Sequence, residues 1–127
     1  MRKFLLLGIA SVAMLLLAGC GDDGESSEEA SDADLVVLGE DIRFDEEVYD
    51  LPAGPATLEF RNVGGIPHNL VFEDGAVAPV AGSVDVTQAP GESITYQLEL
   101  EPGSFPFFCS VPGHREAGME AVLNVSN

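Results

Sequence analysis

The chain has 127 residues, of which 22 are acidic and five are lysine or arginine, so its formal net charge is −17. This length has room for one domain. The strongly negative charge excludes a nucleic-acid-binding role and favours a basic protein partner, whose attraction would weaken as salt increases. The same acidity is also typical of surfaces that only keep a protein soluble, and of proteins from salty habitats.

Residues 1–19 have the features of a secretory signal peptide. Arg2 and Lys3 precede an apolar run from Phe4 to Ala18, which is shorter than a membrane-spanning helix needs. The run ends in Leu-Leu-Ala-Gly-Cys, with the cysteine at position 20. This ending resembles a bacterial lipobox, which implies cleavage just before Cys20 and acylation of its sulfur. An ordinary secretory signal with cleavage nearby is the alternative.

Residues 20–34 are expected to form an acidic, disordered tether between the lipidated cysteine and a folded domain at residues 35–127. After the cysteine the tether holds only Gly, Asp, Glu, Ser and Ala, so it has no aromatic residue that could build a core. Loss of residues 1–19 removes two cations and no acidic residue, which takes the formal charge from −17 to −19. We therefore expect an extracytoplasmic protein that is lipid-anchored to a membrane, in the periplasm or at the cell surface.

The remainder of the chain has the pattern of short strands separated by turns. Turn signals rich in glycine and proline occur at 51–55, 64–65, 89–91 and 101–103. In chain order, the expected strands are 35–38, 42–44, 57–63, 68–72, 94–100, 104–109 and 119–125. The segment 76–85 fits either a loop or a small helical turn. Short strands at this spacing predict an all-β sandwich with Greek-key connections.

Alternation within the last two strands predicts where their side chains point. Phe105, Phe107 and Cys109 share one face, because successive residues of a strand face opposite sides of the sheet. Met119 shares one face of the final strand with the alternate residues that follow it. If both faces line the core, Cys109 and Met119 point inward at the same end of the sandwich, joined by only nine residues.

Four side chains that can bind a soft metal ion fall into one pattern. The chain has two histidines, His68 and His114, and the part after residue 34 has one cysteine and one methionine, Cys109 and Met119. The last three are spaced Cys-x4-His-x4-Met. Each residue alone fits an ordinary core or surface position. Together, two imidazoles, one thiolate and one weak thioether form the ligand set of a blue-copper electron-transfer site.

The segments that carry these residues are similar to cupredoxin sequences. Residues 65–72, Gly-Ile-Pro-His-Asn-Leu-Val-Phe, resemble the first-ligand strand of plastocyanins, and residues 103–114 and 118–125 resemble the ligand loop and last strand of cupredoxins. The four residues between Cys109 and His114 match azurins and several other bacterial cupredoxins, whereas the spacing from His114 to the methionine is plastocyanin-like. The resemblance implies a cupredoxin-like Greek-key β-sandwich with one copper ion, Cu(II) or Cu(I), that is an electron carrier and not an enzyme.

The resemblance also implies roles for residues around the metal. Asn69 would tie the first-histidine strand to the ligand loop by hydrogen bonds, with Ser110 as its partner beside the thiolate. His114 would be the electron port, and an apolar docking patch around its exposed edge would consist of Ile66, Pro67, Val111 and Pro112. The alternatives are that Asn69 is an ordinary polar residue at a strand edge and that the patch is incidental.

The leading hypothesis is a monomer that shuttles single electrons between membrane-associated redox partners, such as a basic cytochrome or a copper oxidase. A lipid anchor would concentrate it near them. A copper chaperone is the second hypothesis, although chaperones favour exposed sites that are often rich in methionine or histidine. A copper enzyme needs an open coordination position or extra copper centres, which two histidines do not supply. An adhesive β-sandwich without metal is the remaining alternative.

Overall fold

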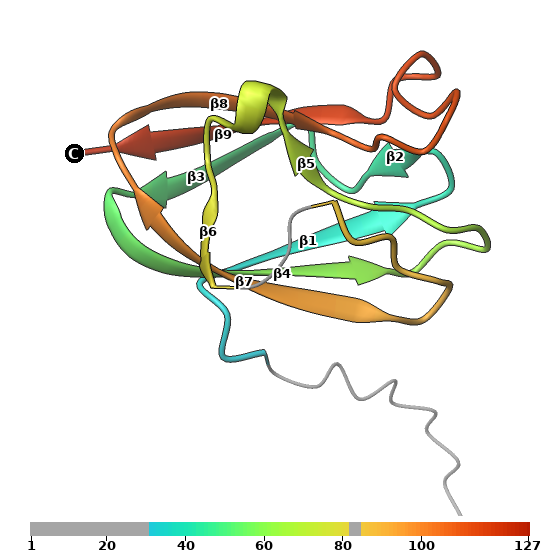
Figure 1. Cartoon of the computed structure of the whole chain (residues 1–127), viewed down its shortest axis with the longest axis horizontal. Coiled ribbons are helices and arrows are strands. Elements are labelled where there is room, and N and C mark those ends of the chain that lie inside the picture. Colours follow the sequence, from blue (N-terminus) through green and yellow to red (C-terminus); the bar gives the residue numbers. More distant parts are fainter. Residues whose placement is uncertain (1–30, 82–84) are drawn as a thin grey trace, which may run out of the picture.

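In the computed structural model, residues 31–81 and 85–127 are described, and they form two β-sheets packed against each other (Figure 1). A 3-10 turn, η1 (Glu73–Gly75), follows the fifth strand. Within the two described stretches no helix is long and apolar enough to cross a membrane. In chain order the strands are β1 (Leu35–Glu40), β2 (Arg43–Phe44), β3 (Val48–Pro52), β4 (Gly54–Asn62), β5 (Val71–Phe72), β6 (Pro79–Ala81), β7 (Ser93–Leu100), β8 (Gly103–Phe108) and β9 (Glu120–Ser126).

Both sheets are mixed. One has the strand order β2-β1-β4-β7-β6 and the other has the order β3-β9-β8-β5. β1 runs parallel to β4 and β3 runs parallel to β9, while the other pairs are antiparallel. The chain changes sheet after β2, β3, β4, β5 and β7, so strands that are neighbours in sequence often lie in different sheets. The predicted all-β sandwich is confirmed.

Alternating apolar residues explain why the long strands pair as they do. Leu58 and Phe60 of β4 are completely buried, and they pair in register with Tyr96 and Ile94 of β7. Leu123 of β9 is also completely buried. Each large apolar side chain that is removed from water stabilises the fold by about 1.5–3 kcal/mol, so the shared inward face holds the two sheets together.

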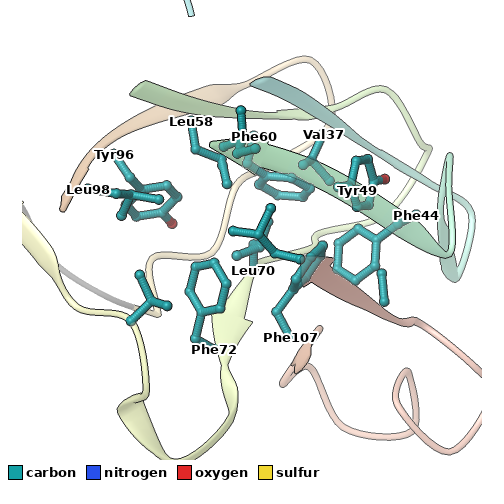
Figure 2. Packing of buried hydrophobic residues seen from close by; sticks show 14 of the residues in the cluster. Val37, Phe44, Tyr49, Leu58, Phe60, Leu70, Phe72, Tyr96, Leu98 and Phe107 are labelled. Carbon is teal, nitrogen blue, oxygen red and sulfur yellow. The ribbon is translucent and has the colours of Figure 1, made fainter. Parts of the chain in front are cut away.

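The centre of the core is aromatic, as Figure 2 shows. The ring of Phe107 in β8 lies 5.0 Å from Phe44, 5.6 Å from Phe72 and 5.7 Å from Tyr49, measured between ring centroids. Phe44 belongs to one sheet, and the other three rings belong to the opposite sheet. Phe107 therefore fixes the end of β8 in the core, two residues before Cys109.

The structure contains two strands that the sequence pattern did not predict. β3 lies where the first proline-rich turn signal begins, and its inward residues Tyr49 and Leu51 are buried against β9. The turn residues Pro52 and Gly54 concealed this alternation. β6 lies within the segment 76–85, for which a loop or helical turn was expected, and it forms the edge of the first sheet beside β7.

Two predicted strands are shorter than expected. Of the strand expected at 68–72, only Val71–Phe72 pairs as β5, and His68 instead makes an isolated bridge to Gln88. Of the strand expected at 42–44, Ile42 lies in the turn before β2 with a φ of 59°. A positive φ is unusual for a β-branched residue, and it prevents Ile42 from continuing the strand.

Candidate metal centre

His68 is held in position by contacts between two loops. Its backbone N–H donates to the carbonyl of Gln88 at 3.1 Å, and its carbonyl accepts from the N–H of Gln88 at 2.8 Å. The buried amide of Asn62 donates to the carbonyls of Gln88 and Ile66, at 2.9 and 2.8 Å. Asn62 therefore braces both sides of the His68 segment. Sequence reasoning missed this residue, because an asparagine at the end of a strand is an ordinary turn residue.

Backbone hydrogen bonds close the loop that carries the other three predicted ligands. The N–H of Cys109 donates to the carbonyl of Met119 at 3.0 Å, and the N–H of Met119 donates to the carbonyl of His114 at 3.0 Å. The N–H of His114 in turn donates to the carbonyl of Val111 at 3.0 Å. Gly113 supplies the left-handed conformation that this tight turn requires, with a φ of 85°. The loop therefore brings Cys109, His114 and Met119 to one place.

Three potential ligand atoms converge below the surface. The Sγ atom of Cys109 lies 3.5 Å from Nδ1 of His114 and 4.0 Å from Nδ1 of His68, and the two Nδ1 atoms are 3.2 Å apart. A trigonal ion with bonds of about 2.0 Å to nitrogen and about 2.3 Å to sulfur needs separations of about 3.5–3.8 Å between its ligand atoms. The observed distances depart from this range by at most about 0.3 Å, so small side-chain movements would let the three residues hold a single metal ion.

Burial makes the imidazole of His68 a suitable ligand. His68 and Cys109 have no exposed surface, and His114 is 9 % exposed. Burial lowers the pKa of His68, and the nearby imidazole of His114 lowers it further, while Asp41 and the carbonyl of Glu40 act in the opposite direction. A lowered pKa favours the neutral imidazole, whose free nitrogen lone pair is the form that binds metals.

Met119 is buried at the end of the loop that carries Cys109 and His114. Its side chain has no exposed surface, and its backbone is hydrogen-bonded to both Cys109 and His114, as described above. The inward orientation that the strand pattern predicted for Met119 and for alternate residues of β9 is confirmed, because Ala121, Leu123 and Val125 are buried as well.

Asn69 and Ser110 contact each other beside the thiol. The Oδ1 atom of Asn69 accepts from the backbone N–H of Ser110 at 2.8 Å, and its Nδ2 donates to Oγ of Ser110 at 2.8 Å. The backbone N–H of Asn69 donates to Sγ of Cys109 at 3.5 Å. Asp85, which sequence reasoning did not single out, accepts from both side chains. A lone aspartate in so acidic a chain carries no signal that could have identified it.

The residues predicted to form a docking patch immediately precede the two histidines in the chain. Ile66 is 37 % exposed and Pro67 is exposed, and together they lead into His68. Val111 is half-buried and Pro112 is exposed, three and two residues before His114, respectively. Apolar surface therefore lies in both segments that lead to the candidate metal centre.

Comparison with known proteins agrees with this geometry. Residues 32–126 match the family of copper binding proteins described as the plastocyanin/azurin family. The chloroplastic plastocyanin of Hordeum vulgare is 33% identical over 122 residues, which cover 92% of this chain and 76% of that protein. The plastocyanin of Mercurialis perennis is 37% identical over 102 residues, which cover 72% of this chain and 98% of that protein.

Solved structures share the fold. The dithionite-reduced auracyanin of Roseiflexus castenholzii superposes with a TM-score of 0.61 at 23% identity, covering 73% of this chain and 96% of its own. The oxidised plastocyanin of Dryopteris crassirhizoma superposes with a TM-score of 0.54 at 25% identity, covering 72% of this chain and 99% of its own.

Proposed function

The chain belongs to the plastocyanin/azurin family of copper-binding proteins, whose members are electron carriers and not enzymes, and we propose that its four predicted ligands hold one copper ion for one-electron transfer. The proposed ligands are His68, Cys109, His114 and Met119. The observation that carries the proposal is the convergence of the cysteine sulfur with one nitrogen of each histidine, all within 4.8 Å of one another.

The ligand set suits both states of such a carrier. When bound, copper would supply the exchange of one electron between Cu(II) and Cu(I). Imidazole nitrogens suit the oxidised ion, and the thiolate of Cys109 and the thioether of Met119 suit the reduced ion. The burial of both sulfur residues and the backbone hydrogen bonds of the loop limit how far the ligands move. Small ligand movement keeps the barrier to electron exchange low.

Neighbouring groups would orient the ligands. In this proposal, Asn69 and Ser110 tie the His68 segment to the ligand loop, and the backbone N–H of Asn69 stabilises negative charge on the sulfur of Cys109. The burial of the site also argues against a copper chaperone, which would need accessible ligands for rapid transfer.

His114 is the proposed electron port. It is the one of the three grouped ligands with any exposed surface. We propose that a redox partner docks on the surrounding apolar residues, namely Ile66, Pro67, Val111 and Pro112. A basic cytochrome or copper oxidase fits the charge, because each of the three arginines in the described residues is paired with a carboxylate and many carboxylates remain without a cation. We propose that the carrier acts as a monomer.

We also propose that the protein is anchored outside the cytoplasm through Cys20. Removal of residues 1–19 and acylation of Cys20 would leave residues 20–34 as a tether for the domain at 35–127. The signal peptide, Cys20 and most of the tether lie outside the described residues. The last tether residue, Asp34, exchanges hydrogen bonds with the backbone of Thr57 in β4, at 2.9 and 2.7 Å. The tether would therefore join the domain beside β4, directly before β1.

The two cysteines allow a matched test of the copper site. Purified protein mixed with Cu(II) should become intensely blue through thiolate-to-copper charge transfer, with one copper ion bound per chain. Cys109→Ser should stay colourless, whereas Cys20→Ser should become as blue as the wild type. A blue Cys109→Ser protein would refute the ligand assignment. Rapid transfer of copper from the loaded protein to a copper-free acceptor would favour a chaperone instead.

The same Cys20→Ser variant tests the anchor. In a bacterial host, the wild-type chain should fractionate with membranes and its N-terminal peptide should carry the mass of attached acyl chains. The variant should lose both properties while keeping its copper. Membrane association that survives the substitution would contradict lipidation at Cys20.

A further inference from the structure

The carboxylate of Asp85 completes a closed hydrogen-bond network beside the candidate metal centre. The hydroxyl of Ser110 donates to Oδ1 of Asp85 at 2.8 Å, and Nδ2 of Asn69 donates to the same oxygen. Nδ2 of Asn69 also donates to Oγ of Ser110. Both hydrogens of the amide and the hydrogen of the hydroxyl are therefore committed within these three residues.

The network fixes which way the amide of Asn69 points. The backbone N–H of Ser110 is a donor only, so the amide atom that faces it at 2.8 Å is the oxygen. An ionised carboxylate is an acceptor only, so the amide atom that faces Asp85 is the nitrogen. The two partners enforce the same orientation from opposite sides. The backbone N–H of this same Asn69 donates to the sulfur of Cys109.

Asp85 also carries a negative charge to the edge of the centre. Its hydrogen bond to Ser110 holds the carboxylate against the residue that follows Cys109. The pKa of Tyr96 is raised mainly by burial and also by the negative charge of Asp85, so the field of this carboxylate reaches the interior. The side chain of Asp85 is exposed, so salt would screen part of this field. A nearby negative charge favours the more positive of two oxidation states.

We propose that Asp85 is a positioning residue of the copper centre, which holds the link between Asn69 and Ser110 and lowers the reduction potential by stabilising Cu(II). This inference rests on the proposed copper function. The backbone of Asp85 has a φ of 62°, a conformation that asparagine and glycine also adopt readily. Both replacements should therefore fold, and they separate the charge from the hydrogen bonds.

The first experiment compares the midpoint potentials of the copper-loaded wild type, Asp85→Asn and Glu101→Gln. Asparagine keeps an oxygen that accepts the same hydrogen bonds but removes the charge. Glu101 is an exposed control in the turn before β8, and the strand between it and Cys109 extends about 20 Å. We expect Asp85→Asn to raise the potential and Glu101→Gln to leave it nearly unchanged. The difference between Asp85→Asn and wild type should shrink at high ionic strength, because salt screens a charge and not a change of geometry.

The second experiment needs no copper. In the copper-free protein, the amide hydrogen of Ser110 should exchange with solvent faster in Asp85→Gly than in the wild type, because the amide of Asn69 loses its outer support. The proposal is overturned if the potential of Asp85→Asn differs from wild type by no more than that of Glu101→Gln, or if Asp85→Gly leaves the exchange rate unchanged. A wild-type protein that never becomes blue would refute the proposed function, and the exchange rate would still test the link.

Discussion

Replacement of Gly39 by alanine should destabilise the protein and disturb the candidate metal centre together. Gly39 lies in β1, where an added Cβ atom would lie 2.7 Å from Cζ and 2.8 Å from Cε2 of Phe60. The same atom would lie 3.6 Å from Cβ of His68. Phe60 has no exposed surface, and the ring of Phe44 packs against it at 6.1 Å. The ring can therefore yield only by displacing other core side chains.

The size of the effect follows from two opposing terms. Overpacking of a tightly filled core costs about 1–3 kcal/mol. Alanine also restricts the unfolded chain more than glycine does, which restores about 0.4–1 kcal/mol. The net loss in the free energy of unfolding is then about 0–2.6 kcal/mol, with a mid-value of about 1.3 kcal/mol. For a domain of this size, a loss of about 1.3 kcal/mol lowers the melting temperature by about 5–10 °C.

Chemical denaturation of the copper-free protein measures this loss directly, and absorption spectroscopy of the copper-loaded protein reports the displacement of His68. The matched control is Gly65→Ala, because the nearest atom to a Cβ there is Oδ1 of Asp41 at 3.7 Å, an ordinary contact. The control should keep the blue spectrum of the wild type and gain about 0.4–1 kcal/mol of stability, because alanine restricts the unfolded chain there too. If Gly39→Ala is as stable as Gly65→Ala, the close approach of β1 to Phe60 does not constrain the fold as argued.

Three further outcomes are expected. Met119→Leu should keep copper but raise the reduction potential, because a weak electron donor is lost; an unchanged or lower potential in voltammetry would contradict the ligand role. Ile42→Asn should raise the free energy of unfolding by about 0.5–1 kcal/mol, because asparagine tolerates the positive φ that strains isoleucine; no gain in chemical denaturation would count against strain at this turn. The copper-free protein should lose stability as the pH falls below about 6.5. Below that pH, His68 binds a proton in the unfolded chain, whereas in the folded protein its lowered pKa delays protonation to a lower pH. Denaturation curves of His68→Gln should show a weaker dependence on pH.

The fold could be predicted largely from strand alternation, and the errors have a common physical cause. In β4 and β7 the apolar residues alternate over many positions, so the two-residue period of a β-strand was clear. β3 has only five residues, and the proline and glycine near its end are the residues that normally mark turns. Its burial depends on parallel pairing with β9, which lies some seventy positions later in the chain. Alternation of apolar residues within a short stretch of sequence cannot reveal pairing with so distant a strand.

The candidate site was easier to predict than the fold around it, because its residue types are rare in this chain. With two histidines and one cysteine after the tether, few other sites for a soft metal ion are possible, and the short loop limits how far Cys109 can lie from His114. Gly39, Asn62 and Asp85 are common residue types, so their roles arise only from the neighbours that the tertiary structure brings to them. Copper binding should therefore depend mainly on the rare residues that the sequence reveals. The potential and rigidity of the centre should depend on common residues, so substitutions at these three positions should alter its properties before they abolish its colour.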